Sequence, residues 1–502
     1  KKKTIYYENA VIKIYDLPIF YLPKFSHPDP TVKRRSGFLP PTYSNTKNLG
    51  AGISIPYFWA IDESKNFTFT NRLQFSENPI FMGEYHQAFK NSFLMTDFGF
   101  TEGYKKTSAT KKAGQKSHFF SKFVKNYSTD KYESILNINL QEVSNDKYLK
   151  LYKIKSNLVD YKKDNLENSL NYIFQEDDLF LGFNASSYET LKDNYNDKYE
   201  YILPEVTFDK NLISSNQIGN LDIQSNFKHH QYDTNKTTNF LINDLNWNFR
   251  DLRFKSGAKT KISGNLKNIN YDAKNVKKFK SDPTNELFGA LGYLNKLNLQ
   301  KSNGGSTHYL TPKIFFRYAP GTMRNVESGS RLDPVKAFSL DRLNEVDNFE
   351  TGLTSTLGFD YKIKNNDKNL DFSVAQIINE KENKKMSSIS SMDEKLSDLA
   401  GSANMKFNEN VGINYNFLID QNYNDLNYNE VETVLDFSPI KFNFSYLEEA
   451  KHVGNQEYFK TKLGYTSGQS LLSFETKRNL VTDSSEFYNL SYEYLNDCLR
   501  AG

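Results

Sequence analysis

Apolar and polar residues alternate with a period of two along most of the chain, and this pattern constrains the fold more than any other sequence feature. Neighbouring side chains of a β-strand point to opposite faces, so each such run is typical of a strand with one apolar face. Runs of this kind lie at 67–75, 136–140, 411–419, 442–446 and 488–494. In the fourth run we expect Phe442, Phe444 and Tyr446 on one face, with Asn443 and Ser445 on the other. The sequence therefore predicts an all-β fold.

The residues opposite the apolar face indicate which kind of β protein this is. They are largely Asn, Ser, Thr and Gly, whereas charged residues gather in connecting segments at 105–116, 192–198, 380–385 and 451–456. A water-filled barrel interior accommodates such a polar face well. The roughly 460 residues that follow Pro41, at about 10 residues per strand with comparable connections, allow about 22–26 strands. We therefore predict one large antiparallel transmembrane β-barrel.

Aromatic residues are frequent in a chain that is otherwise polar. The 502 residues include 33 Tyr and 39 Phe, and no apolar run reaches the length of about 18 residues that a membrane-spanning helix needs. Transmembrane barrels have this composition, because one residue in two faces lipid and aromatic girdles line both interfaces. Two alternatives remain, namely another outer-membrane barrel such as a porin or nutrient receptor, and a soluble secreted β-protein that binds carbohydrate. The net charge of +4, from 64 basic and 60 acidic residues, is too balanced to indicate nucleic-acid binding.

Half of the chain's 14 prolines lie between Leu17 and Pro56. Proline has no backbone N–H and is tolerated only at strand edges, strand starts and bends, so this cluster marks a place where sheet pairing is weak or ends. Two strand-like runs, 4–14 and 19–25, indicate the end of a preceding β-domain. From the residues alone, Pro41 could merely start a strand and Pro56 could mark a bulge.

No arrangement of residues in the sequence nominates a catalytic or metal site. The adjacent His229 and His230 would point to opposite faces of a strand, whereas metal ligands must converge on one point. The GxSxG, P-loop and GxGxxG motifs are absent. We therefore predict a protein that is not an enzyme and that uses no metal or cofactor. One short helix is predicted at 283–294, where Leu287, Leu291 and Leu294 would share a face.

Motifs along nearly the whole chain resemble those of the LptD family of outer-membrane LPS-assembly proteins, also called OstA or organic solvent tolerance proteins. Near the N-terminus they are PIFYLP at 18–23, HP at 27–28, KRRSGFL at 33–39 and PYFW at 56–59. Further along they are VSNDKYLKLY at 143–152, LPEVTF at 203–208, LTPKIFFRYAPGTMRN at 310–325, FSLDR at 338–342, FETGLTSTLGFDY at 349–361, SD at 397–398 and NDCL at 496–499. The longer motifs come in the family's order and at fitting spacings, which makes the resemblance specific.

The resemblance implies an architecture and a function. Residues 1–30 would be the final strands of a periplasmic β-jellyroll, and residues 31–502 would be an outer-membrane β-barrel, with most of the jellyroll and the last barrel strands outside this chain. An LptE-like lipoprotein would plug the barrel, and an LptA-like periplasmic bridge would deliver lipopolysaccharide to the jellyroll. The protein would then insert lipopolysaccharide into the outer leaflet of the cell outer membrane through a lateral gate between the first and last barrel strands.

The same resemblance implies roles for particular residues. Pro41 and Pro56 would be lateral-gate residues, because they weaken the pairing of the first barrel strand with its neighbours. The junction between jellyroll and barrel would contain Pro18, Pro23, Pro28, Arg34 and Arg35. By itself the single cysteine, Cys498, is either a small buried hydrophobe or half of a disulfide. The resemblance implies the second, with a partner outside this chain and a position near the periplasmic end of a late strand.

Overall fold

The computed structural model describes residues 4–501 except for 15–16, 30, 32–33, 47, 108–112, 193–194, 196, 366–367 and 496–499. Almost all of the regular structure in these residues is β. The exceptions are the short helix α1 (Tyr148–Tyr152) and the 3-10 turn η1 (Lys336–Phe338). Among the described residues, no helix has both the length and the apolar character needed to cross a membrane. The chain divides into two compact units, unit 1 with residues 1–209, 226–241 and 271–284, and unit 2 with residues 210–225, 242–270 and 285–502.

The first two strands form a hairpin of their own. Strands β1 (Thr4–Ile14) and β2 (Leu17–Pro28) pair in an antiparallel ladder that is separate from the large sheet. This confirms the two strand-like runs predicted at the N-terminus. Three prolines lie in β2 at places that tolerate a missing N–H. Pro18 lies at the ladder's irregularity, Pro23 faces the skipped residue Asn9, and Pro28 ends the strand.

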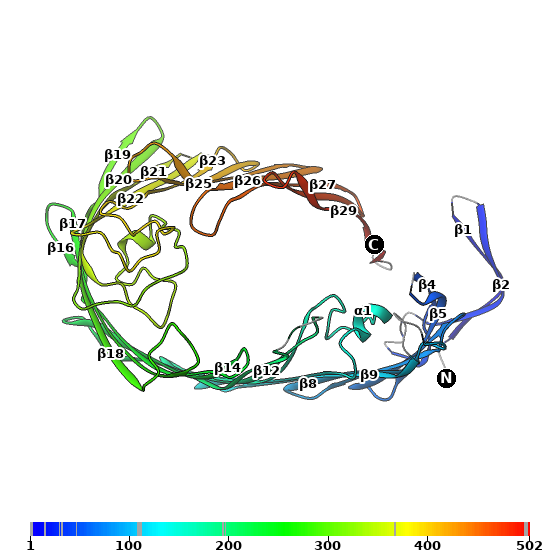
Figure 1. Cartoon of the computed structure of the whole chain (residues 1–502). Coiled ribbons are helices and arrows are strands. Elements are labelled where there is room, and N and C mark those ends of the chain that lie inside the picture. The colour runs from blue at the N-terminus through cyan, green and yellow to red at the C-terminus, as the bar shows by residue number, and fades with distance from the viewer. Residues whose placement is uncertain are drawn as a thin grey trace. The chain divides into compact units, whose positions relative to one another are not determined.

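The strands of unit 1 follow one another through the sheet in chain order (Figure 1). From β4 to β12, each strand pairs antiparallel with the next, and the very short β3 pairs with β5. The bounds are β3 (Gly37–Phe38), β4 (Thr42–Thr46), β5 (Gly50–Ala60), β6 (Lys65–Gln74), β7 (Ile80–Ala88), β8 (Ser92–Gly103), β9 (Ala113–Ser128), β10 (Tyr132–Val143), β11 (Asn165–Glu176) and β12 (Leu179–Thr190).

Five longer strands contribute residues to both units. They are β13 (Tyr199–Ser215), β14 (Gly219–Tyr232), β15 (Lys236–Asn248), β17 (Ala258–Lys274) and β18 (Thr284–Leu297).

Unit 2 continues with antiparallel neighbours in chain order from β20 to β30. Strand β20 also pairs with β18 and β19. The remaining bounds are β16 (Leu252–Arg253), β19 (Leu299–Asn303), β20 (Ser306–Ala319), β21 (Gly352–Lys364), β22 (Asn369–Asn379), β23 (Leu399–Lys406), β24 (Val411–Ile419), β25 (Leu426–Phe437), β26 (Ile440–Glu449), β27 (Gln456–Ser467), β28 (Ser470–Asn479), β29 (Ser484–Leu495) and β30 (Arg500–Ala501).

The predicted fold class is confirmed: β3 to β30 belong to one large antiparallel sheet, as expected of a large β-barrel. If β3, β16 and β30, which have two residues each, are set aside, the number of strands in the described sheet falls within the predicted range.

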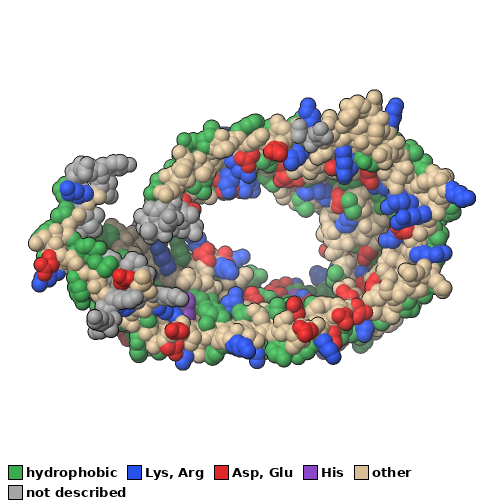
Figure 2. All heavy atoms as spheres, turned by 180° about the vertical axis from the view of Figure 1, so that it is seen from behind, with side chains coloured by type: hydrophobic (Ala, Val, Ile, Leu, Met, Phe, Trp, Pro, Cys, Tyr) green, Lys and Arg blue, Asp and Glu red, His purple; other side chains and the backbone are tan. Residues whose placement is uncertain are grey.

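The two faces of the sheet differ as the alternation predicts. In β26, Phe442, Phe444 and Tyr446 alternate with Asn443 and Ser445 in a ladder without irregularities, so the two sets lie on opposite faces. The Asn443 face continues into buried residues at the end of the strand. Figure 2 shows hydrophobic side chains along one face of the sheet and charged side chains both along the other face and around the strand ends.

The predicted helix at 283–294 is wrong, because this segment belongs to strand β18. Leu287 and Leu291 are four residues apart, a spacing that suits one face of a helix and equally one face of a strand. The structure shows a strand and not a helix, because Leu287 and Leu291 are 63% and 60% exposed while Phe288 and Ala290, which lie between them, are buried. That exposure alternates with a period of two, as in a strand.

In each unit, the long connections lie at one end of the strands, and most of the short ones lie at the other end. In unit 1, the connections at 61–64, 89–91 and 129–131 are short, and the one at 144–164 is long. In unit 2, the connections at 365–368, 407–410 and 438–439 are short, and those at 320–351 and 380–398 are long. We call these ends the short-turn edge and the long-loop edge. Outer-membrane barrels have short turns on the periplasmic side and longer loops outside.

The long connections supply the apolar cores that the sheet itself lacks. In unit 1, Tyr148, Leu149 and Tyr152 of α1 pack with buried strand residues such as Ile80 and Phe120. In unit 2, the 320–351 and 380–398 loops contribute a separate buried cluster. Its loop residues are Met323, Val326, Leu332, Ala337, Met386 and Met392. These loops are therefore packed parts of the fold, and they cover the polar face of the sheet.

Candidate functional site

The predicted gate prolines lie at one interruption in the pairing of the first strands. Pro41 directly precedes β4, and Pro56 lies within β5. Strand β5 pairs with β4 from Gly50 to Ser54 and with β3 only at Tyr57 and Phe58. Between these two ladders, the Leu39 N–H donates to the Pro56 carbonyl at 2.9 Å. The structure therefore brings Pro41 and Pro56 to neighbouring segments where neither can donate a ladder hydrogen bond.

On its other side, β5 is paired without interruption. Pro56 lies opposite Thr70 in a ladder with β6 that runs from Gly52 to Ala60. On the opposite side, by contrast, β5 pairs with two short pieces, β3 and β4, each along a different part of its length. Along β5, the interrupted pairing therefore lies on the side of β3 and β4 and not on the side of β6.

Two arginines in the segment before β3 contact the large sheet and the N-terminal hairpin. The Arg34 guanidinium donates from Nη1 to the Glu63 carbonyl at 2.8 Å and lies 5.6 Å from the centroid of the Phe58 ring. The Arg35 guanidinium donates to the Thr4 hydroxyl of β1. Arg34 therefore contacts the large sheet and Arg35 contacts the N-terminal hairpin, an arrangement suited to a junction between two β-domains.

Cys498 lies outside the residues that the structure describes, between β29 and β30. Its position and partner therefore stay a prediction. Tyr494 and Leu495 at the end of β29 pair with the two residues of β30.

A buried polar cluster attaches the 144–164 loop to strands β6, β8 and β9. His118 of β9 lies 3.1 Å from the Asp97 carboxylate through Nε2 and 3.2 Å from the Tyr148 hydroxyl through Nδ1. Arg72 of β6 donates from Nη1 to the Tyr152 carbonyl at 2.7 Å. Burial raises the pKa of both Tyr148 and Tyr152, so their hydroxyls stay neutral and can donate. The VSNDKYLKLY motif supplies these loop residues.

A second cluster fixes the 320–351 loop in unit 2 through a buried ion pair. The Arg342 guanidinium donates from Nε to the Glu350 carboxylate at 2.7 Å and from Nη2 to the Thr354 hydroxyl at 3.1 Å. Arg317 of β20 donates from Nε to the Leu340 carbonyl at 2.6 Å. Burial alone would raise the pKa of Glu350, but the positive charges of Arg342 and Arg317 hold it below its ordinary value. Glu350 is therefore a buried carboxylate paired with Arg342, and Arg317 donates to its backbone carbonyl.

Further ion pairs attach the same loop to neighbouring strands. The Lys267 ammonium of β17 lies 3.0 Å from the Asp341 carboxylate. Arg331 donates to the Glu449 carboxylate of β26 at 3.1 Å from Nε and 2.6 Å from Nη2. Its guanidinium also lies 3.9 Å from the centroid of the Tyr428 ring. In each pair one partner is buried, Lys267 at 5% and Glu449 at 0% side-chain exposure, so removal of its partly exposed partner would leave a buried charge uncompensated.

One cluster has the hydrogen-bonding order of a catalytic Ser–His–acid triad. The Ser391 hydroxyl lies 2.7 Å from His452 Nε2, and His452 Nδ1 lies 3.1 Å from the Glu449 carboxylate. The exposed fractions are 2% for Ser391, 2% for His452 and 0% for Glu449. A nucleophile this deeply buried cannot reach an external substrate, so the cluster joins the 380–398 loop to β26. The described residues contain no group of three or more His, Cys, Asp or Glu side chains arranged to hold a metal.

Local sequence patterns predict none of these buried clusters. The motifs FSLDR and FETGLTSTLGFDY, which resemble those of the LptD family, supply Asp341, Arg342 and Glu350. A usable signal was present, because each motif places charged residues directly beside large apolar ones within a long connection. Such charges are almost never fully buried unless they are paired.

Comparisons with known proteins give one consistent result. The family model described as LptD, LPS transport system D, matches residues 116–477. The chain is 46% identical over 54 residues to the LPS-assembly protein LptD of Francisella tularensis subsp. novicida (strain U112), which covers 11% of this chain and 6% of that protein. It is 40% identical over 62 residues to the LPS-assembly protein LptD of Shewanella sp. (strain MR-4), covering 12% and 8%.

A third relative extends the aligned length. The match to the LPS-assembly protein LptD of Nitrosococcus oceani is 36% identical over 75 residues, which covers 15% of this chain and 10% of that protein. The matched stretches thus span a tenth or less of the length of these three relatives.

Proposed function

Because the chain belongs to the LptD family, whose model matches residues 116–477, we propose that it transports lipopolysaccharide to the surface of the outer membrane. The match over most of the chain is the observation that carries this proposal. The fold supports it, since a large antiparallel sheet with one aromatic, apolar face and one polar face is what an outer-membrane barrel requires.

The proposed location is the outer membrane, with the short-turn edge toward the periplasm and the long-loop edge outside. The chain enters β4 from the short-turn edge, so this orientation places the β1–β2 hairpin on the periplasmic side. We propose residues 1–30 as the end of the periplasmic jellyroll and residues 31–502 as barrel. The separate ladder of β1 and β2 supports that division.

The proposed exit for the lipid is a lateral gate between the first and last barrel strands. Its support is the interruption between the β3 and β4 ladders, where Pro41 and Pro56 face a gap in the hydrogen bonding of β5. Each missing N–H removes a bond worth about 0.5–1.5 kcal/mol. A short, broken first strand therefore separates from a neighbour at lower cost than a continuous one.

The proposed partners are an LptE-like lipoprotein within the barrel and an LptA-like bridge on the jellyroll. Arg34 and Arg35, with Pro18, Pro23 and Pro28, would form the junction that transfers lipopolysaccharide between the domains. The contacts of Arg34 with the Glu63 carbonyl and of Arg35 with Thr4 support this assignment. We propose no enzymatic role, a view that the burial of the Ser391–His452–Glu449 cluster supports.

The proposed disulfide of Cys498 gives a direct prediction. In the complete protein that contains this chain, non-reducing gels are expected to show a mobility change on reduction, and Cys498→Ser is expected to abolish that change. Because a cross-link acts largely on the unfolded ensemble, by about 2–4 kcal/mol, the variant should lose folding yield more than barrel structure. Identical mobility of the original protein with and without reductant would contradict the disulfide.

Depletion of the complete protein in cells tests the transport function. Newly made lipopolysaccharide should then fail to reach the cell surface and accumulate inside, and the outer membrane should admit hydrophobic dyes. Restoration of the complete gene should reverse both effects, while depletion of an unrelated porin serves as the control. Normal surface lipopolysaccharide after depletion would refute the proposal and favour a porin or receptor.

A further inference from the structure

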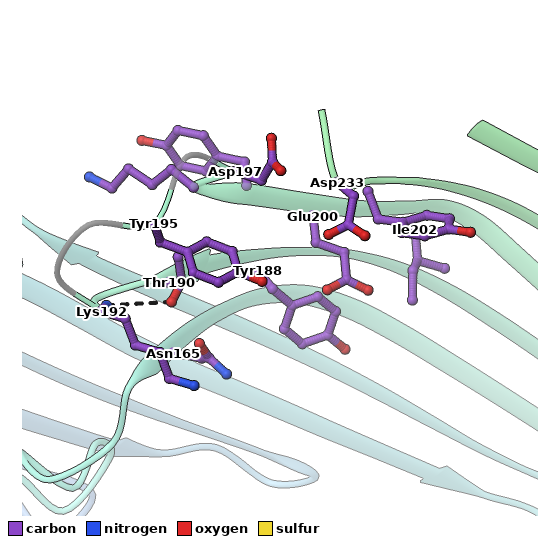
Figure 3. A pocket seen from close by; sticks show the side chains of 12 residues that line it. Asn165, Tyr188, Thr190, Lys192, Tyr195, Asp197, Glu200, Ile202 and Asp233 are labelled. Carbon is purple, nitrogen blue, oxygen red and sulfur yellow. Dashed lines mark hydrogen bonds between the residues drawn. The ribbon is translucent and has the colours of Figure 1, made fainter. Parts of the chain in front are cut away.

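A cavity of about 420 Å³ lies at the long-loop edge of unit 1, between β11, β12, β13 and β14. Figure 3 shows residues from these strands and from the 191–198 connection around one space. All of its lining residues belong to unit 1. The gate, the junction and the buried clusters described above make no use of this cavity.

Tyrosine rings form much of the cavity wall. Tyr188 comes from β12, Tyr195 from the loop, Tyr199 from β13 and Tyr232 from β14. Tyr195 and Tyr199 are 55% and 50% exposed. The Tyr199 ring stacks on Tyr201, and the Lys198 ammonium lies 5.6 Å from its centroid, so Tyr195 supplies the ring face that is open to a ligand. In the part of the chain that the structure describes, the Tyr188 hydroxyl has no hydrogen-bond partner. An aromatic ring offers a broad, weakly negative face, on which the C–H groups of a sugar ring can pack.

Three carboxylate side chains also line the cavity, and each forms a polar contact with a neighbouring side chain. Glu200 lies 2.7 Å from His230 Nε2, and Asp233 accepts from the Lys236 ammonium at 2.9 Å. Asp197 accepts a hydrogen bond from the Thr234 hydroxyl. A carboxylate can accept about four hydrogen bonds, so each can take further ones from ligand hydroxyls. Figure 3 shows Glu200 and Asp233 directed toward the same space as the Tyr188 ring.

The positive charges of the cavity do not favour an anionic ligand. Lys198 lies 2.7 Å from the Glu189 carboxylate and 3.0 Å from the Asp146 carboxylate, and these contacts raise its pKa. Lys192 is the one lining lysine without an ion-pair partner among the described residues. Three carboxylates surround the same space, so a phosphate would meet repulsion that one lysine does not offset.

We propose that this cavity binds a neutral saccharide. An open aromatic face, oriented carboxylate acceptors and a concave shape are the features that recognise a ring rich in hydroxyl groups and C–H faces. The saccharide could be the sugar portion of lipopolysaccharide passing this edge or a free sugar from outside the cell. Both sources share the same chemistry, and binding of a free sugar does not depend on the proposed transport function.

Saturation-transfer NMR on the detergent-solubilised chain tests the proposal, with glucose, galactose, N-acetylglucosamine and maltotriose as probes and inorganic phosphate as competitor. At least one sugar should bind and phosphate should not displace it. Tyr195→Ala, in an exposed loop where loss of folding is not expected, and Glu200→Gln should each weaken binding tenfold or more. The matched control is Tyr127→Ala, because Tyr127 of β9 lies in the same unit, is 43% exposed and does not line the cavity. It should change binding less than twofold.

The outcomes separate the proposal from its alternatives. If no sugar binds, if phosphate displaces the sugar, or if the control weakens binding as much as Tyr195→Ala, the saccharide site is refuted. If the cavity variants lose sugar binding, surface lipopolysaccharide in cells carrying them in the complete protein identifies the source. If the amount of surface lipopolysaccharide is lower than in cells with the control variant, the cavity binds the sugars of lipopolysaccharide. If the amount is unchanged, the cavity binds a free sugar.

Discussion

Glu350→Ala is expected to lower the free energy of unfolding by about 3–5 kcal/mol, because it leaves buried guanidinium charge without a counterion. Arg342 is 0% exposed, and its Nε donates to the Glu350 carboxylate at 2.7 Å. The matched control is Asp436→Ala, since Asp436 pairs with Lys441 at 2.9 Å where the two side chains are 48% and 55% exposed. That change should cost no more than about 1 kcal/mol. Urea unfolding in lipid vesicles measures both.

The same ion pair between Arg342 and Glu350 should also make the free energy of unfolding depend on pH. The folded-state pKa of Glu350 lies below its ordinary value of 4.5. Its contribution to stability is therefore present above pH 4.5 and is lost as the pH falls through the lowered value. The original protein should lose more stability than Glu350→Ala on acidification below about pH 4.5. An equal loss in the two proteins, or equal costs for Glu350→Ala and Asp436→Ala, would mean that the buried pair does not anchor the loop.

Simultaneous replacement of Pro41 and Pro56 by threonine in the complete protein is expected to slow lipopolysaccharide export while barrel assembly stays intact. Threonine restores a backbone N–H at each position and suits a strand. Each new ladder bond would strengthen the first strand by about 0.5–1.5 kcal/mol. The rate at which newly made lipopolysaccharide reaches the surface measures the effect.

The control for this variant is Pro312→Thr, because Pro312 lies opposite Phe359 in the ladder of β20 and β21, far from the first strand in sequence. That change should leave export at the normal rate. Unchanged export and an intact permeability barrier in the Pro41/Pro56 double variant would refute the gate assignment. Equal slowing by Pro312→Thr would show a general effect of restoring sheet hydrogen bonds.

Local sequence patterns predict the strands of this protein well. The alternation at 442–446 identifies a strand and its two faces, because strand periodicity needs no knowledge of distant residues. The proline cluster predicts the weak first strand for a similar reason, since a missing N–H is a property of the residue itself. The helix predicted at 283–294 is wrong because an i, i+4 spacing of leucines fits both periodicities.

The buried clusters could not be predicted in the same way. Arg331 and Glu449 are 118 residues apart, and they meet only because one long connection folds over the sheet and reaches β26. Ser391 and His452 likewise come from two different connections. Their pairing depends on the register of several strands and on the loop packing, which no local pattern specifies. The saccharide cavity has the same origin, since β11, β12, β13 and β14 each contribute to its wall.

Reconstitution of the complete protein in lipid vesicles tests transport most directly. Lipopolysaccharide is supplied on the short-turn side of the protein with the delivery partners, and its arrival in the opposite leaflet is followed with a reagent that cannot cross the membrane. Arrival should depend on the protein and should be slower for the Pro41/Pro56 double variant than for Pro312→Thr. If lipopolysaccharide reaches that leaflet no faster than in protein-free vesicles, although the protein is folded and its partners are bound, the transport function is contradicted.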